Sequence, residues 1–186
     1  AMEAFLQERG MQTFGGLITA RWTAAISGLG RFGKNNFLYT KQDGSWVWLQ
    51  TWLVDAELAC DTPAQPECAC PPGCRRCIDA CPTGALSEPF CMDRGRCIAQ
   101  LSYYTEKLPS EALRSQMSLW LYGCDVCQNV CPLNKGKWRD SAADFPGLNE
   151  LAKILQPETI LAMDEEVFKK KIQPRFWYIP PEKFWL

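Results

Sequence analysis

β-Branched and aromatic residues are concentrated in two stretches of the N-terminal third, residues 36–41 and 45–54. Asp43-Gly44 lies between them, and an Asp-Gly pair between two such runs is typical of a hairpin turn. The sequence therefore predicts a β-hairpin. Its second strand would place Trp46, Trp48 and Trp52 on one face by period two, and we expect that face to pack against the core.

Five other stretches show helical patterns: residues 21–30, 96–108, 110–123, 147–155 and 164–172. The first should end at Gly28 or Gly30, because glycine favours the left-handed conformation that caps helix C-termini. Pro109 should separate the second helix from the third, with Ser110 as the N-cap of the third. The mixture of helices with a hairpin predicts an α+β fold.

Cysteine divides the chain into three expected domains. Residues 1–58 contain none and hold the first helix and the hairpin, whereas residues 59–140 contain every cysteine and a Pro-rich coil. Residues 141–186 form a helical segment with an aromatic, Pro-rich tail. We expect the middle segment to be the functional module.

Composition narrows the class of protein. The chain has 186 residues, of which 47% are hydrophobic and 22% charged, which is typical of a globular protein. The formal charge of −1 and the lack of a long basic tract argue against nucleic-acid binding by this chain. No apolar run approaches 18 residues and no signal pattern is present, so we expect a cytoplasmic protein that does not bind membranes.

The chain has eleven cysteines and no histidine. The odd count and tight local spacing argue against a disulfide scaffold. Without histidine, Rieske centres and His-containing zinc sites are excluded. The thiolates are therefore expected to hold a soft metal unaided, as iron–sulfur clusters or as all-cysteine zinc.

Two runs, CRRCIDACP at 74–82 and CDVCQNVCP at 124–132, share the pattern C-x2-C-x3-C-P. In two-cluster ferredoxins the cysteine before the proline ligates the other cluster, which predicts that Cys81 and Cys131 cross over. The expected ligands of the two [4Fe–4S] clusters are Cys70, Cys74, Cys77 and Cys131 for one, and Cys97, Cys124, Cys127 and Cys81 for the other. Cys68 is the alternative to Cys70. Cys97 is preferred to Cys91 because it opens a helix, and Cys60, Cys68 and Cys91 are expected to be small buried residues.

Two other patterns have a simpler interpretation. The stretch GLGRFG at 28–33 fits G-x-G-x-x-G, but a helix precedes it and a hairpin follows, which is the wrong context for dinucleotide binding. Cys70, Cys74 and Cys77 have the C-x3-C-x2-C spacing of a radical-SAM cluster. The second cysteine run would supply a fourth ligand to that cluster, and the chain is short for a barrel enzyme.

Five motifs in order, GLGRFGKNNFLY, GSWVWLQTWLVD, CRRCIDACPTGAL, RCIAQLSYY and YGCDVCQNVCPLN, resemble the double-cluster, ferredoxin-like part of epoxyqueuosine reductases and the iron–sulfur domains of reductive dehalogenases. The resemblance covers about residues 20–135. It implies two [4Fe–4S] clusters that relay electrons to a cobalamin held against a neighbouring catalytic domain, mostly upstream of residue 1. The loop with Gly28, Gly30 and Gly33 would face that cobalamin.

The chain departs from this family at two places. The family's usual first cluster ligand falls at Pro71, so Cys70 is a displaced substitute. The family's catalytic acid before the GLG loop has no counterpart between Thr13 and Arg21, which argues against queuosine reduction by these residues. We therefore expect the electron-delivery part of a cobalamin-dependent oxidoreductase, with a redox partner protein or a catalytic domain outside this sequence. The alternative is a stand-alone ferredoxin-like carrier or adaptor without catalytic activity.

Overall fold

The structure, a computed structural model, describes residues 2–16, 18–104, 108–120, 122–139 and 146–176. Within these ranges short helices combine with small antiparallel sheets, which agrees with the predicted mixture of helices and strands. The helices are α1 (Met2–Gln7), α2 (Ala20–Ile26), α3 (Arg76–Asp79), α4 (Ile98–Tyr104), α5 (Glu111–Met117), α6 (Val126–Asn129), the 3₁₀ helix η1 (Pro132–Asn134), α7 (Leu148–Ile154), α8 (Pro157–Leu161) and α9 (Glu165–Lys171). The strands are β1 (Thr13–Gly15), β2 (Arg31–Phe32), β3 (Leu38–Tyr39), β4 (Trp52–Val54), β5 (Leu86–Glu88) and β6 (Cys91–Met92).

The strands pair differently from the predicted hairpin around Asp43-Gly44. β3 pairs with β2, and β4 pairs with β1, while β5 pairs with β6. At the Asp43-Gly44 turn a single bridge joins Thr40 to Gly44. The predicted hairpin is therefore wrong, and the N-terminal hairpin that does form is β2–β3.

The helix boundaries follow the predicted capping chemistry. α2 ends just before Gly28, which adopts a left-handed φ of +73° and donates its N–H to the Ala25 carbonyl at 3.0 Å. Ser110 caps α5, since its side chain accepts the Leu113 N–H at 3.4 Å. Both residues therefore position the ends of helices as local rules require.

The tryptophans do not form the expected buried face. Trp46 is half-buried and packs edge-on against Trp138, with ring centroids 5.0 Å apart. Trp52 is also half-buried, but Trp48 is 92% exposed. Because residues 45–51 do not form a strand, the period-two pattern does not determine which way these side chains point.

A buried polar network joins the N-terminal segment to the second cysteine run. The Ser45 N–H donates to Asn134 Oδ1 at 2.9 Å, and the Ser45 hydroxyl donates to Gln128 Oε1 at 2.8 Å. Asn134 Nδ2 donates in turn to the Ser45 hydroxyl at 2.8 Å and to the Gln128 carbonyl at 2.9 Å. All three side chains are buried, so their satisfied hydrogen bonds hold the two segments in one register.

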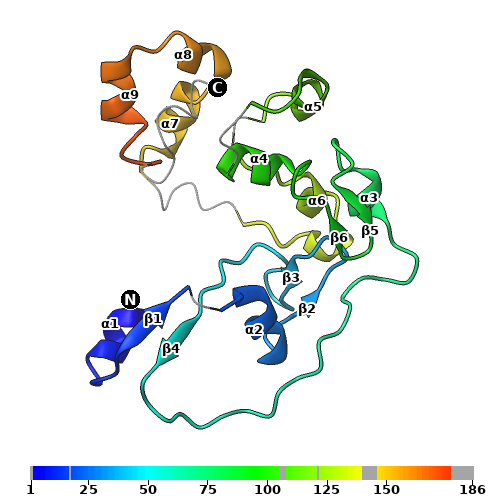
Figure 1. The fold of residues 1–186 in the computed structure, drawn as a ribbon, viewed down its shortest axis with the longest axis vertical. Helices are drawn as coiled ribbons and strands as arrows, with labels where there is room; N and C mark the ends of the chain where they lie inside the picture. The colour runs from blue at the N-terminus through cyan, green and yellow to red at the C-terminus, as the bar shows by residue number, and fades with distance from the viewer. Residues whose placement is uncertain (1, 17, 105–107, 121, 140–145, 177–186) are drawn as a thin grey trace.

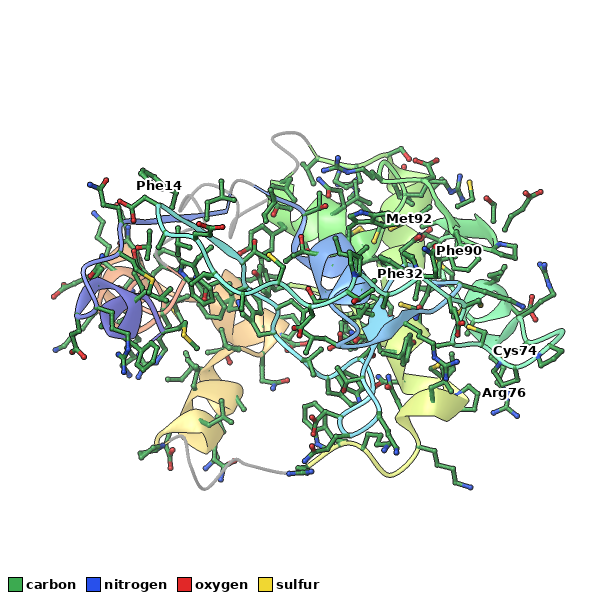
Figure 2. All side chains as sticks on the ribbon, turned by 90° about the horizontal axis from the view of Figure 1, so that it is seen from below. Phe14, Phe32, Cys74, Arg76, Phe90 and Met92 are labelled. Atoms are coloured by element: carbon green, nitrogen blue, oxygen red, sulfur yellow. The ribbon has the colours of Figure 1, made fainter. Side chains whose placement is uncertain are left out.

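Figure 1 shows three sets of elements that lie apart from one another, with α2, β2 and β3 between the first and the second. The N-terminal elements α1, β1 and β4 lie at one end, and α3, α6, β5 and β6 gather at the other, while α7–α9 form a separate helical group. Phe14 on β1 lies at the opposite end of the molecule from Cys74 and Arg76 (Figure 2). None of the helices among the described residues has the length and apolar character needed to cross a bilayer.

Candidate metal centre

The two cysteine runs fold into the same local structure. α3 and α6 each span four residues and each begin two residues after the first cysteine of its run. Their hydrogen bonds correspond: the Ile78 N–H donates to the Arg75 carbonyl, and the Gln128 N–H donates to the Asp125 carbonyl, both at 2.9 Å. The fifty-residue sequence offset is thus a structural repeat, and α3 and α6 contact each other.

Each run contributes cysteines to two separate cavities. Cavity I is lined by Cys70, Cys74, Cys77 and Cys131, together with Asn35, Tyr39, Pro71, Arg76, Pro132 and Leu133. Three of these cysteines come from the first run and the loop before it, and the fourth is the last cysteine of the second run. Figure 2 shows two of the lining residues, Cys74 and Arg76, at the end of the molecule opposite Phe14.

Cavity II has the complementary set of cysteines. It is lined by Cys81, Cys97, Cys124 and Cys127, and by residues that include Asn35, Phe37, Thr83, Met92 and Tyr104. Cys97 immediately precedes α4 and accepts the Leu101 N–H on its carbonyl at 2.8 Å. The eight cysteines expected to be ligands thus line two cavities, four in each, and their assignment to two clusters stays a prediction.

Electrostatic contacts among the thiols lie mostly within one set, and the contact between Cys77 and Cys127 joins the two sets. Burial and then the charge of Cys131 raise the pKa of Cys77. Burial raises the pKa of Cys124, to which Cys97 and Cys81 also contribute. Burial and the neighbouring Cys124 and Cys77 thiols raise the pKa of Cys127 to about 12. Because crowded buried thiolates repel one another, a cationic group between them would stabilise the deprotonated form.

Backbone N–H groups point at the sulfurs from the surrounding loops. The Lys34 N–H donates to Cys70 Sγ at 3.3 Å, and Lys34 Nζ donates to the Cys74 carbonyl at 2.8 Å. Burial alone would raise the pKa of Cys81, but hydrogen bonds from Leu86, Thr83 and Ala85 outweigh it and lower that pKa. These N–H groups are the interactions that tune bound iron–sulfur clusters.

The number and type of donors can be compared with those of zinc sites and of iron–sulfur clusters. A tetrahedral zinc site needs four sulfurs at about 2.3 Å from a single point. Among the described residues, no three His, Cys, Asp or Glu side chains are close enough to hold one metal ion. Four cysteines line each cavity, and four cysteine thiolates are the ligands of a four-iron cluster.

The remaining cysteines lie outside both cavities. Cys60, Cys68 and Cys91 are exposed, so the expectation that they are buried is wrong. Cys91 lies on β6, and Cys68 lies beside β2 through a bridge to Phe32. Small size and apolar character favour burial of cysteine on average. These three cysteines are exposed because they lie in loops or on a short edge strand.

The glycine loop lies next to cavity I. It lines a surface groove that contains Gly28, Leu29, Gly30 and Tyr39, and Tyr39 also lines cavity I. Leu29 is 62% exposed. Gly30 and Gly33 do not have positive φ values, and a Cβ atom on either would collide with Tyr39. Their small size is therefore explained by close packing on β3.

Four buried polar residues at or near the cysteine runs were not predicted from the sequence. Asn35 and Tyr39 are buried, and Asn35 lines both cavities. Gln128 and Asn134 lie within and directly after the second cysteine run, and they are buried although they are polar. Gln128 could have been noticed in the sequence, because it is an amide inside a metal-binding motif. If such a side chain is buried, it needs hydrogen-bond partners in fixed positions.

Comparisons with known proteins agree with this site. Residues 69–134 match the family described as 4Fe-4S double cluster binding domain. The epoxyqueuosine reductase of Xanthomonas campestris is 36% identical over 84% of this chain and 43% of its own length. That of Bacillus subtilis is 38% identical over 84% of this chain and 39% of its own length. That of Synechococcus is 41% identical over 68% of this chain and 37% of its own length.

Solved structures show the same relationship. A selenomethionine-labelled epoxyqueuosine reductase superposes with a TM-score of 0.78 at 34% identity, covering 91% of this chain and 46% of that one. An epoxyqueuosine reductase bound to an epoxyqueuosine-modified tRNA-Tyr stem loop superposes with a TM-score of 0.76 at 33% identity, covering 91% and 45%. The chain thus spans less than half the length of these relatives. It is an epoxyqueuosine reductase-like iron–sulfur protein, and its residues 69–134 are a 4Fe-4S double cluster binding domain.

Proposed function

We propose that this chain carries single electrons through two adjacent [4Fe–4S] clusters and delivers them to a cobalamin in a longer epoxyqueuosine reductase-like enzyme. The observation that carries the proposal is the grouping of eight cysteines into two sets of four, each containing one cysteine from the distant run. This exchange is the ferredoxin-like feature. We assign Cys70, Cys74, Cys77 and Cys131 to one cluster and Cys81, Cys97, Cys124 and Cys127 to the other.

Each bound cluster supplies one-electron redox chemistry. The chain's own residues hold the clusters, exclude water and place them close together. Cys77 and Ile78 pack with Leu86, and Cys81, Cys127 and Val130 pack against this group. Ligands of both iron–sulfur clusters therefore pack in one hydrophobic core. This shared core supports electron transfer between the two sites.

We assign residues 59–140 to the double-cluster domain, between an N-terminal segment (1–58) and a helical C-terminal segment (141–186). The loop with Gly28, Gly30 and Gly33 is the part that we propose to face cobalamin. Its groove and cavity I share Tyr39, and this supports a position next to the first cluster. Since Gly30 and Gly33 pack on Tyr39, Gly28 and Leu29 are the parts of the loop open to a cofactor.

One solved relative is described with a tRNA stem loop bound. The formal charge of −1 supports a division of labour in the longer protein, with this chain supplying electrons and other residues holding the RNA. The absence of an acidic residue between Thr13 and Arg21 supports the same division for the catalytic acid.

The first test is metal analysis after anaerobic purification. Two [4Fe–4S] clusters correspond to about eight iron and eight sulfide per chain, with broad visible absorption. One or two zinc per chain without that absorption, even after anaerobic reconstitution with iron and sulfide, would refute the cluster assignment.

The second test uses the longer native protein purified with a corrinoid available. We expect it to retain the corrinoid and to reduce it when electrons are supplied to the clusters. If the protein carries both clusters but neither binds nor reduces the corrinoid, the stand-alone electron carrier becomes the correct function.

A further inference from the structure

Asn35 is a buried residue that lies between the two cluster sites. It is 3% exposed and lines both cavity I and cavity II. Its Nδ2 group donates to the Tyr39 hydroxyl at 2.9 Å and to the Cys127 carbonyl at 3.3 Å. One side-chain amide thus contacts the lining of cavity I with one N–H and a ligand residue of cavity II with the other.

Tyr39 lines the same cavity as one of the cysteine ligands. It is 5% exposed on β3 and lines cavity I beside Cys131. Its hydroxyl oxygen accepts the Asn35 hydrogen bond, and the side chains that contact the hydroxyl besides Asn35 are Cys131 and Ser45. Tyr39 and Cys131 line cavity I together, and burial, followed by the contact with the Cys131 side chain, raises the pKa of Tyr39.

The glycine loop provides the space for this tyrosine. A Cβ on Gly33 would collide with the Tyr39 ring, and a Cβ on Gly30 would lie 2.6 Å from the Tyr39 carbonyl oxygen. Neither glycine has a positive φ, so the backbone conformation does not require glycine there. Gly30 and Gly33 of the G-x-G-x-x-G pattern therefore leave the space in which Tyr39 packs beside cavity I.

We propose that Asn35 and Tyr39 form a hydrogen-bond bridge between the two cluster sites, with Tyr39 donating to Cys131 and raising the reduction potential of the cluster in cavity I. A donor to a ligating sulfur stabilises the reduced cluster more than the oxidised one, because reduction adds negative charge to the sulfurs. The inference rests on the proposed function, since it requires both clusters. Asn35 and Tyr39 are positioning residues that act through the ligands.

The test is an EPR-monitored redox titration of Tyr39→Phe, which removes only the hydroxyl. We expect the ratio of reduced to oxidised cluster in cavity I to fall up to tenfold at a fixed ambient potential. This corresponds to a fall of about 59 mV in its reduction potential. The cluster in cavity II should keep its potential. Gly33→Ala should lower the same potential, because it displaces the ring from Cys131.

Tyr104→Phe is the matched control, because Tyr104 lines cavity II and is 63% exposed. It should leave the potential of the cluster in cavity I unchanged. Asn35→Ala should shift both potentials, and if that variant does not fold, Tyr39→Phe still decides. A Tyr39→Phe protein with full iron and an unshifted potential would refute the bridge. Absence of both clusters from the wild-type protein would instead overturn the proposed function on which the bridge rests.

Discussion

Cys68 and Cys70 lie two positions apart in a segment that runs beside β2. The Phe32 N–H donates to the Glu67 carbonyl at 3.0 Å, and the Ala69 N–H donates to the Phe32 carbonyl at 2.7 Å. In an extended segment, side chains two positions apart point to the same side. Cys70 nevertheless lines cavity I whereas Cys68 is exposed, so the position of the loop distinguishes two cysteines that the sequence leaves as alternatives.

Cys70→Ser should disturb the cluster in cavity I and lower the iron content from about eight toward about four per chain. Cys68→Ser is the matched control and should keep about eight. Cys60→Ser should also keep both clusters, because its exposed thiol contacts only the Leu58 carbonyl among the described interactions. Iron and sulfide assays with EPR check all three variants. Loss of a cluster in Cys68→Ser but not in Cys70→Ser would reverse the assignment.

Ligand spacing is local, so the cysteines that the sequence singles out can be compared directly with those that line the two cavities. A short helix that the motif itself specifies lies in each run. It places Cys74 near Cys77 in the first run and Cys124 near Cys127 in the second. Asn35 and Tyr39 could not be predicted, since their role depends on packing against cysteines more than thirty positions away. Such contacts leave no periodic pattern in the sequence.

At the scale of elements, the helix ends were predictable and the strand pairing was not. Gly28 and Ser110 act through neighbours within four residues, which local rules describe. The Asp43-Gly44 turn instead docks on Asn134, and residues 45–51 follow that contact rather than pairing with β3. A polar partner ninety positions away overrides the hairpin propensity.

Gly44→Ala should reveal that docking contact. Gly44 has a φ of +61°, and a Cβ there would collide with Asn134 Oδ1. We expect the cluster-loaded protein to lose about 1–3 kcal/mol of unfolding free energy, measured by chemical denaturation under anaerobic conditions.

Gly136→Ala is the control for backbone strain alone. Gly136 has a φ of +70°, but no atom of the described residues lies within 4 Å of the place that a Cβ would take, so its loss should be about 1 kcal/mol or less. Equal losses in the two variants would show that the contact with Asn134 contributes nothing.

At the scale of the whole molecule, the cysteine-rich region and the C-terminal helices should differ in their dependence on metal. The cysteine-rich region buries its apolar side chains, such as Ile78 and Leu86, against the thiols of Cys77, Cys81 and Cys127. The C-terminal helices α8 and α9 bury Ile160, Phe168 and Ile172, large apolar side chains that need no metal. Metal binding should therefore contribute folding free energy mainly to the first region.

Removing iron with a chelator should abolish hydrogen-exchange protection in residues 69–134 while α8 and α9 keep most of theirs. Exchange measured by mass spectrometry on the loaded and chelated protein checks this prediction. Uniform loss of protection along the chain would show that the clusters stabilise the molecule as a whole.

The exchange of Cys81 and Cys131 between the two runs is the central claim for the molecule, because it makes one electron path from two local motifs. The most direct measurement is the EPR spectrum of reduced Cys81→Ala beside those of Cys124→Ala and Cys74→Ala. We expect Cys81→Ala to lose the same signal as Cys124→Ala, since both residues line cavity II. Loss of the signal that Cys74→Ala loses would contradict it and return Cys81 to the cluster of its own run.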